Sequence, residues 1–255
     1  MTQATRMAFR ITLAALALSA ATAFAGPKSA PESTPIGDFP TITGLRIGPS
    51  SAQSTCTLGI TGSPAFIVNY VFPPNDQYYT LLNPLACTQC AAVGAVTAVT
   101  AHAFLSFPAQ CAQLVSVGIY GGTPSPFDPT CLVPDPNLVI CPPFLVNLAP
   151  PAPGNYNFII PMPTGCCITG PAFLKIEFVN LAPGCNTGTT VPRLITTGSC
   201  LPGCNSWNIW PGGGPDELCL DIGFPGNPIM NLEVDCCLST NTHKHSWGTL
   251  KSHYR

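Results

Sequence analysis

Cysteine is the reactive side chain that this sequence carries in greatest number. Fourteen cysteines occur in the 255 residues, and all of them follow residue 55. An even number of cysteines in an oxidising compartment is typical of a disulfide framework, so we expect up to seven bridges, although spacing alone does not give their pairing. The disulfide candidates are Cys56, Cys87, Cys90, Cys111, Cys131, Cys141, Cys166, Cys167, Cys185, Cys200, Cys204, Cys219, Cys236 and Cys237.

Two cysteine pairs are adjacent in the chain, Cys166-Cys167 and Cys236-Cys237. Neighbouring side chains of a strand point to opposite faces of its sheet. We therefore expect each vicinal pair to reach two different partners.

Zinc binding is the alternative use of these cysteines. Cys87 and Cys90 have C-x2-C spacing, and Cys200 and Cys204 have C-x3-C spacing, so the four could resemble a zinc site with four thiolate ligands. The two halves lie much too far apart in sequence for a zinc ribbon, and a thioredoxin-like site would need a βαβ context that is missing. Disulfides are therefore favoured, and no zinc site is predicted.

Acid–base chemistry has few candidates. His102 is the one histidine between Cys56 and Cys237, and it lies in the apolar run AVTAHAFL without a G-x-S-x-G motif. A nucleophilic triad needs such a base together with a positioned nucleophile. A structural histidine is favoured, so we assign no catalytic residue.

The carboxylates form two close groups. Glu233 and Asp235 share strand spacing, and Asp216, Glu217 and Asp221 lie together. Paired carboxylates can hydrolyse glycosides, which makes a secreted hydrolase one alternative. The second group is a weak Ca²⁺ candidate, because Ca²⁺ takes carboxylate and carbonyl oxygens. Solvated strand edges are the favoured explanation of both groups, and no cofactor is otherwise expected.

Two tryptophans could bind sugars. Trp207 and Trp210 lie in a turn-rich stretch beside Gly212-Gly213-Gly214, and exposed aromatic rings on the loops of a sandwich suit a glycan ligand. No P-loop lysine follows the glycines, which excludes that phosphate site. An extracellular carbohydrate-binding module is therefore a second alternative, and packing of both rings within the loop is the competing explanation.

Charge and composition narrow the function classes. Only 8% of the residues are charged, and between Cys56 and Cys237 nine carboxylates accompany only two cations, Lys175 and Arg193. Such a domain cannot neutralise a phosphate backbone, so nucleic acid is excluded as a partner. The 30 prolines and 23 glycines exclude long helices.

The elements that must position these side chains are short strands. Apolar, β-branched and aromatic runs recur between turn residues, for example 66–72, 95–107, 113–120, 138–141, 156–160, 172–181, 193–197 and 229–234. In the run 172–181, Leu174, Ile176 and Phe178 alternate with Lys175 and Glu177. A helix competes at 91–103, where valine and threonine favour a strand. We predict an all-β fold: a single antiparallel, jelly-roll-like β-sandwich over residues 54–238, stapled by disulfides.

Both ends of the chain differ from this body. Arg6 and Arg10, the apolar run 11–25 and the ending Ala23-Phe24-Ala25 are typical of an export signal over residues 1–25. The stretch 26–53 is rich in Pro, Ser and Thr, which indicates a flexible linker with room for a short strand at 41–47. No other run is apolar enough to cross a bilayer, so we expect a secreted protein, extracellular, on the outer cell surface or periplasmic.

The last residues, 239–255, form a polar spacer and a basic, amphipathic decapeptide, SWGTLKSHYR. Together with the stretch Cys204–Cys237, which ends in GFPGNPIM and a Cys-Cys pair, this tail resembles the ends of uncharacterised Cys-rich secreted β-sandwich proteins of environmental bacteria. The matching residues of the W-G-x-[LI]-K-x-x-Y-R pattern are Trp247, Gly248, Leu250, Lys251, Tyr254 and Arg255. The resemblance covers about the last fifth of the chain. It implies a sorting or anchoring signal read by cell-surface or secretion machinery, and no enzymatic activity.

The sequence therefore predicts a non-enzymatic, secreted or surface-held structural or adhesive protein. A glycan-binding module and an acidic-residue hydrolase remain as the alternatives.

Overall fold

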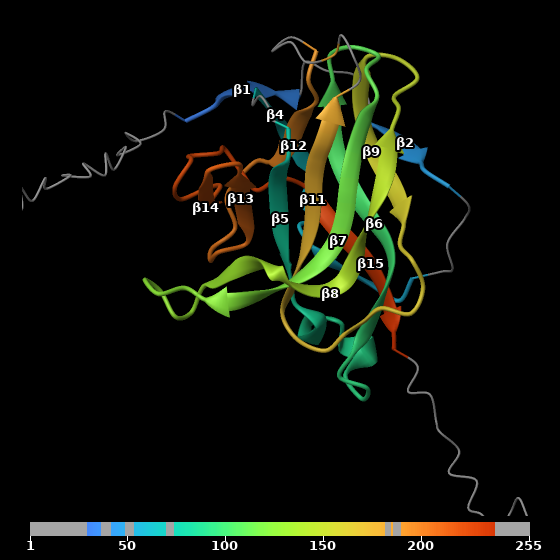
Figure 1. Cartoon of the computed structure of the whole chain (residues 1–255), viewed down its shortest axis with the longest axis vertical. Helices are drawn as coiled ribbons and strands as arrows, with labels where there is room; N and C mark the ends of the chain where they lie inside the picture. The colour runs from blue at the N-terminus through green and yellow to red at the C-terminus, as the bar shows by residue number, and fades with distance from the viewer. Residues whose placement is uncertain are drawn as a thin grey trace, which may run out of the picture.

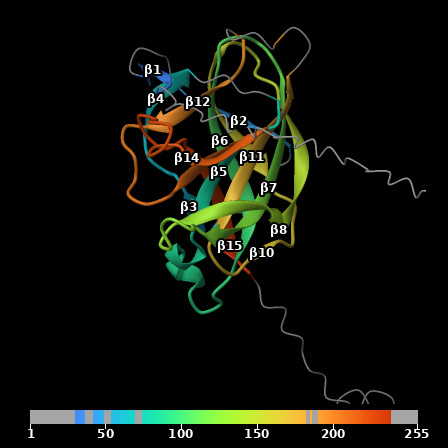
Figure 2. The same ribbon diagram turned by 60° about the vertical axis from the view of Figure 1, so that its left-hand side comes forward.

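Two β-sheets pack face to face in the computed structural model, which describes residues 30–36, 42–48, 54–69, 74–181, 185 and 190–237 (Figures 1 and 2). The predicted export signal and the predicted C-terminal tail lie outside these residues. The elements that lie wholly within these residues are strands and two 3-10 turns, η2 (Pro84–Ala86) and η3 (Thr88–Cys90). Within the described part of the chain, no helix has the length and hydropathy that a membrane span requires. The prediction of an all-β sandwich is confirmed.

The smaller sheet has six strands in the order β14-β13-β5-β11-β7-β8. Their bounds are Gly213–Glu217 (β14), Ser206–Trp210 (β13), Asp76–Leu82 (β5), Ala172–Leu181 (β11), Gln113–Pro124 (β7) and Leu132–Leu148 (β8). The predicted alternation of β11 is confirmed, because Leu174, Ile176 and Phe178 enter the main core. Lys175 and Glu177 therefore lie on the opposite face.

The larger sheet has nine strands around a long central strand, β6 (Val96–Phe107). One edge of β6 pairs with β15 (Met230–Cys236) and then with β12 (Arg193–Thr197), and the other edge pairs with β10 (Cys167–Ile168) and β9 (Gly154–Pro161). Beyond these lie β3 (Cys56–Gly59), β4 (Pro64–Asn69), β1 (Glu32–Pro35) and β2 (Thr43–Arg46). All pairings are antiparallel except that of β2 with β9, which is parallel.

The main core lies between the two sheets. It includes fully buried rings such as Tyr78, Phe107 and Phe158 together with aliphatic side chains from every long strand. Burial of the apolar surface of these side chains makes the main favourable contribution to the free energy of folding. For the run 91–103, where a helix competed with a strand, the strand prediction is confirmed from Val96 onward. The residues before Val96 form turns.

The stretch 26–53, predicted as a flexible linker, contains two short strands: β2 lies in the stretch 41–47 where a short strand was expected, whereas β1 was not expected. β1 pairs with β4, and β2 pairs with β9, so both segments belong to the larger sheet. Ile36 and Ile42 pack on a second cluster, formed by Ile60, Ile67, Ile195 and Ile229 on the outer face of this sheet. Edge pairing uses backbone groups and needs little apolar periodicity, which is why composition did not indicate β1.

All fourteen cysteines form disulfides, which confirms the predicted framework. The bridges are Cys56–Cys87, Cys90–Cys236, Cys111–Cys185, Cys131–Cys204, Cys141–Cys166, Cys167–Cys237 and Cys200–Cys219. Each vicinal pair reaches two different partners, as expected. No two of the four cysteines with zinc-like spacing are bonded to each other.

Two bridges connect the ends of the sandwich domain through very few residues. Cys56 is bonded to Cys87, the chain runs through Thr88 and Gln89 to Cys90, and Cys90 is bonded to Cys236 next to Cys237. We call this path, residues 56, 87–90, 236 and 237, the covalent strap. All other residues between 56 and 237 lie in loops closed by it. Figure 1 shows the turns η2 and η3 beside the end of β15, where the strap lies.

Candidate functional site

The two tryptophans do not form the exposed platform that the sequence suggested. Trp207 is 6% exposed and packs with Tyr79, Tyr120 and Phe173 on the outer face of the six-stranded sheet. Trp210 is half-buried and packs against the main core on the other face. Both residues lie on β13, where a spacing of three sends side chains to opposite faces. The glycan platform at Trp207 and Trp210 is therefore wrong.

The acidic group near β14 closes a turn. Glu217 is buried, and its carboxylate accepts hydrogen bonds from the backbone N–H groups of Ser206, Cys219 and Leu220 at 3.3, 2.7 and 2.8 Å. Asp221 accepts one from the backbone N–H of Glu217 at 2.7 Å. Burial raises the pKa of Glu217, although these three hydrogen bonds oppose the rise.

Calcium binding by Asp216, Glu217 and Asp221 stays a weak prediction. Their carboxylates are not gathered around one point, and across the described ranges no three His, Cys, Asp or Glu side chains form a group suited to a metal ion. The contacts of Glu217 and Asp221 give both carboxylates a structural role that needs no bound cation. Each accepts hydrogen bonds from backbone N–H groups that the turn leaves unpaired.

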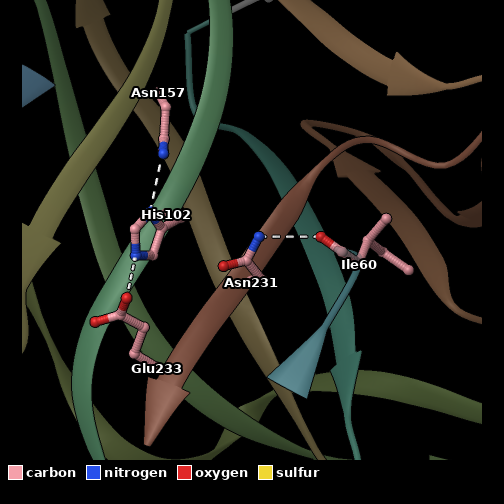
Figure 3. A network of polar contacts seen from close by, with 5 residues as sticks. All are labelled: Ile60, His102, Asn157, Asn231 and Glu233. Carbon is pink, nitrogen blue, oxygen red and sulfur yellow. Dashed lines mark hydrogen bonds and ion pairs between the residues drawn. The ribbon is translucent and has the colours of Figure 1, made fainter. Parts of the chain in front are cut away.

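His102 joins three strands on the outer face of the nine-stranded sheet (Figure 3). Its Nδ1 lies 3.1 Å from Oδ1 of Asn157 on β9. Its Nε2 lies 3.2 Å from Oε1 of Glu233 on β15, at a distance suited to an ion pair. Next to it, Asn231 Nδ2 donates to the carbonyl of Ile60 at 3.1 Å. These contacts of His102 include no hydroxyl nucleophile, and they fit the structural role expected of it.

Glu233 and Asp235 have separate partners. Glu233 lies beside His102, whereas Asp235 accepts hydrogen bonds from the hydroxyl of Thr55 and from the backbone N–H of Cys236. The hydrogen bond from Thr55 lowers the pKa of Asp235, and the hydrogen bond from the backbone of Cys236 lowers it further. Two carboxylates with unlike partners do not resemble the acid and base of a glycosidase, which must face one bond from two sides.

A cavity lies on the same outer face, at the far end of β6 from the strap. It has a volume of about 560 Å³. Its lining includes Ser106 of β6, Arg193 of β12 and Asn155 of β9, and both neighbours are register partners of Ser106. Thr34 and Thr43, from the two N-terminal strands, line it as well. We call this cavity the Arg193 pocket.

Arg193 is unlike the other cation of the domain. Lys175 Nζ lies 2.7 Å from Oε2 of Glu177 and 4.5 Å from the centre of the Tyr120 ring. Arg193 forms no ion pair with any carboxylate among the described residues, and its Nε is buried without a hydrogen-bond partner. The sequence carried a signal for this site, since Arg193 is one of two cations in an acidic domain, but the residues around it come from distant strands.

Comparison with known proteins adds no assignment, because no family model, no curated protein and no solved structure matches this chain. The resemblance of the C-terminal tail to that of Cys-rich secreted proteins therefore stays a prediction.

Proposed function

We propose that this chain is an exported, non-enzymatic structural or adhesive module that is retained at the cell surface by its C-terminal tail. The observation that carries the proposal is the covalent strap. A tether attached after Cys237 pulls on Cys236 and Cys90, and through Cys87 on Cys56, so the load between Cys56 and Cys237 passes through covalent bonds.

Two further features support the proposal, one concerning the extracellular location and the other the attachment of the tail. Seven bridges require an oxidising compartment to form and persist. The two bridges of the vicinal pair Cys236-Cys237 fix the end of β15 to η3 and to β10, at the point where the chain continues toward the predicted tail. A load-bearing module needs reinforcement at this point.

The test follows the protein in a bacterial host. The full chain and a variant without residues 246–255 are expressed with residues 1–25 in place, and cells, periplasm and medium are probed separately. We expect the full chain on the cell surface and the truncated variant in the medium. A matched control carries Lys251→Ala and Arg255→Ala, which remove only the charges of the tail.

The same fractions test both parts of the proposal. Full chain found in the cytoplasm, or with several free thiols by mass spectrometry, would contradict export and oxidation. Equal release of the full chain and the truncated variant would contradict retention by the tail and leave export intact.

A further inference from the structure

The Arg193 pocket has a charge pattern that calls for an anionic ligand. Among the residues that the structure describes, its lining contains one guanidinium and no carboxylate. A buried polar group without a hydrogen-bond partner lowers the stability of the fold. The Nε of Arg193 is such a group. The guanidinium fork matches a carboxylate in a two-point, charge-assisted contact. An anion in the pocket would supply the acceptor that Arg193 lacks.

The neutral side chains of the pocket indicate what else the ligand carries. Ser106, Asn155, Thr34 and Thr43 offer hydroxyl and amide groups, which donate and accept hydrogen bonds. Ile67 and the two prolines, Pro108 and Pro153, supply apolar surface. Hydroxyl groups on a carbon ring would satisfy both kinds of lining. A phosphate is less suited, since its two charges meet only one cation here.

The spacing of the row Arg193–Ser106–Asn155 suits a small ring. The three residues are neighbours across β12, β6 and β9, so the outer two are separated by two strand spacings, about 10 Å. A ligand bound to Arg193 through its carboxylate can thus reach Asn155 with a hydroxyl on the far side. The volume of about 560 Å³ lies within the range of small-molecule sites.

We propose that the Arg193 pocket binds an acidic sugar, that is, a small ligand with one carboxylate and several hydroxyl groups. The pocket lies at the opposite end of β6 from the strap, and the inference does not depend on the proposed retention at the cell surface. Nine carboxylates in the same domain oppose unspecific attraction of anions, so binding must come from the local geometry.

The direct test is calorimetric titration of the full, oxidised chain with glucuronic, galacturonic and mannuronic acid. Each acid is compared with its neutral parent, glucose, galactose or mannose, and all are compared with acetate. We expect at least one acid to bind at least tenfold more tightly than both its parent sugar and acetate. Equal affinity for acid and parent, equal affinity for acid and acetate, or no binding at all would overturn the proposal.

Variants locate the binding. Arg193→Gln should weaken the acid at least tenfold and leave the weak binding of the parent sugar unchanged. Arg46→Gln is the matched control, because Arg46 is exposed on β2 and does not line the pocket. An equal loss in both variants would overturn the proposal.

A second variant guards against misfolding of Arg193→Gln. Ser106→Ala removes one hydroxyl from the lining, and we expect a loss of about threefold to tenfold for the acid, with unchanged near-UV circular dichroism. Asp38 follows β1 in sequence, so Asp38→Asn tests whether the chain itself supplies the anion. Binding that occurs only after Asp38→Asn would overturn the proposal for the native protein.

Discussion

Lys175 shows how this domain accommodates a buried charge. The side chain is 5% exposed and lies between the carboxylate of Glu177 and the ring of Tyr120. The ammonium is therefore stabilised by an ion pair on one side and by a cation–π contact on the other. Removing one partner of such a pair leaves the other charge uncompensated, whereas replacing the cation by an apolar chain of similar length removes its desolvation cost.

We therefore expect Glu177→Gln to lower the free energy of unfolding by roughly 2–3 kcal/mol, with the ring of Tyr120 retaining part of the stabilisation. Lys175→Met should cost less than about 1 kcal/mol. Urea unfolding of both variants at neutral pH measures the difference. A larger loss for Lys175→Met than for Glu177→Gln would contradict this account of the pair.

Tyr79 gives the domain a dependence on alkaline pH. Burial raises the pKa of its hydroxyl, and the nearby Tyr120, Glu177 and Asp135 add to the rise. The hydroxyl donates a hydrogen bond to Oε1 of Gln77 at 2.6 Å, which also requires the proton.

In the unfolded chain a tyrosine loses its proton near its ordinary pKa of about 10, whereas folded Tyr79 keeps it. The folded state then binds more protons, so the free energy of unfolding falls as the pH rises above about 10. We expect Tyr79→Phe to show a smaller fall between about pH 9 and about pH 11, measured by urea unfolding. An identical slope in the wild type and Tyr79→Phe would exclude Tyr79 as the cause.

At the scale of the elements, alternation and composition predicted most of the central strands. β11 and β12 were predicted with their observed bounds, and β6 within one residue, because their apolar side chains face a core. β5 was missed because it begins with Asp76, a polar residue in a strand. The structure buries Asp76 and satisfies it through the Tyr78 hydroxyl at 2.7 Å and Asn208 Nδ2 at 2.6 Å.

The site residues were harder to predict than the strands. Trp207 and Trp210 were expected in a turn-rich stretch, whereas both lie on the strand β13, which sends their side chains to opposite faces. The Arg193 pocket draws on β1, β2, β6, β9 and β12, whose neighbourhood depends on long-range pairing. Sequence spacing contains no information on that pairing, and the disulfide connectivity was open for the same reason.

The bridge Cys90–Cys236 joins η3 to β15 and should contribute strongly to stability. Its own loop spans 146 residues, but the bridges Cys111–Cys185 and Cys167–Cys237 leave a much shorter path between the same two points. Because stabilisation grows with the loop that a bridge closes, we expect Cys90→Ser with Cys236→Ser to cost about 2–4 kcal/mol. Thermal and urea unfolding of the double variant measure this, and an unchanged midpoint would contradict the argument.

At the scale of the whole molecule, the strap predicts how the domain behaves under force. When the chain is pulled from its two termini, tension enters the domain at Cys56 and leaves at Cys237, and the strap carries it between these points. β1 and β2 precede Cys56, so only the N-terminal segment, residues 30–55, can be peeled from the sheet. Its peeling lengthens the chain by about 90 Å, whereas residues 57–86 and 91–235 would add about 600 Å if the strap were open.

Single-molecule pulling of the full chain should therefore show only the short extension, and a reducing agent should release the long one. Cys90→Ser with Cys236→Ser should release an intermediate length of roughly 140 Å, because the shortest remaining path to Cys237 runs through Cys111–Cys185 and Cys167–Cys237. Cys200→Ser with Cys219→Ser is the control, since that bridge closes a loop wholly within the strapped residues and its loss should add nothing. Release of the long extension under oxidising conditions would show that the strap does not carry the load, and would remove the observation on which the proposed structural function rests.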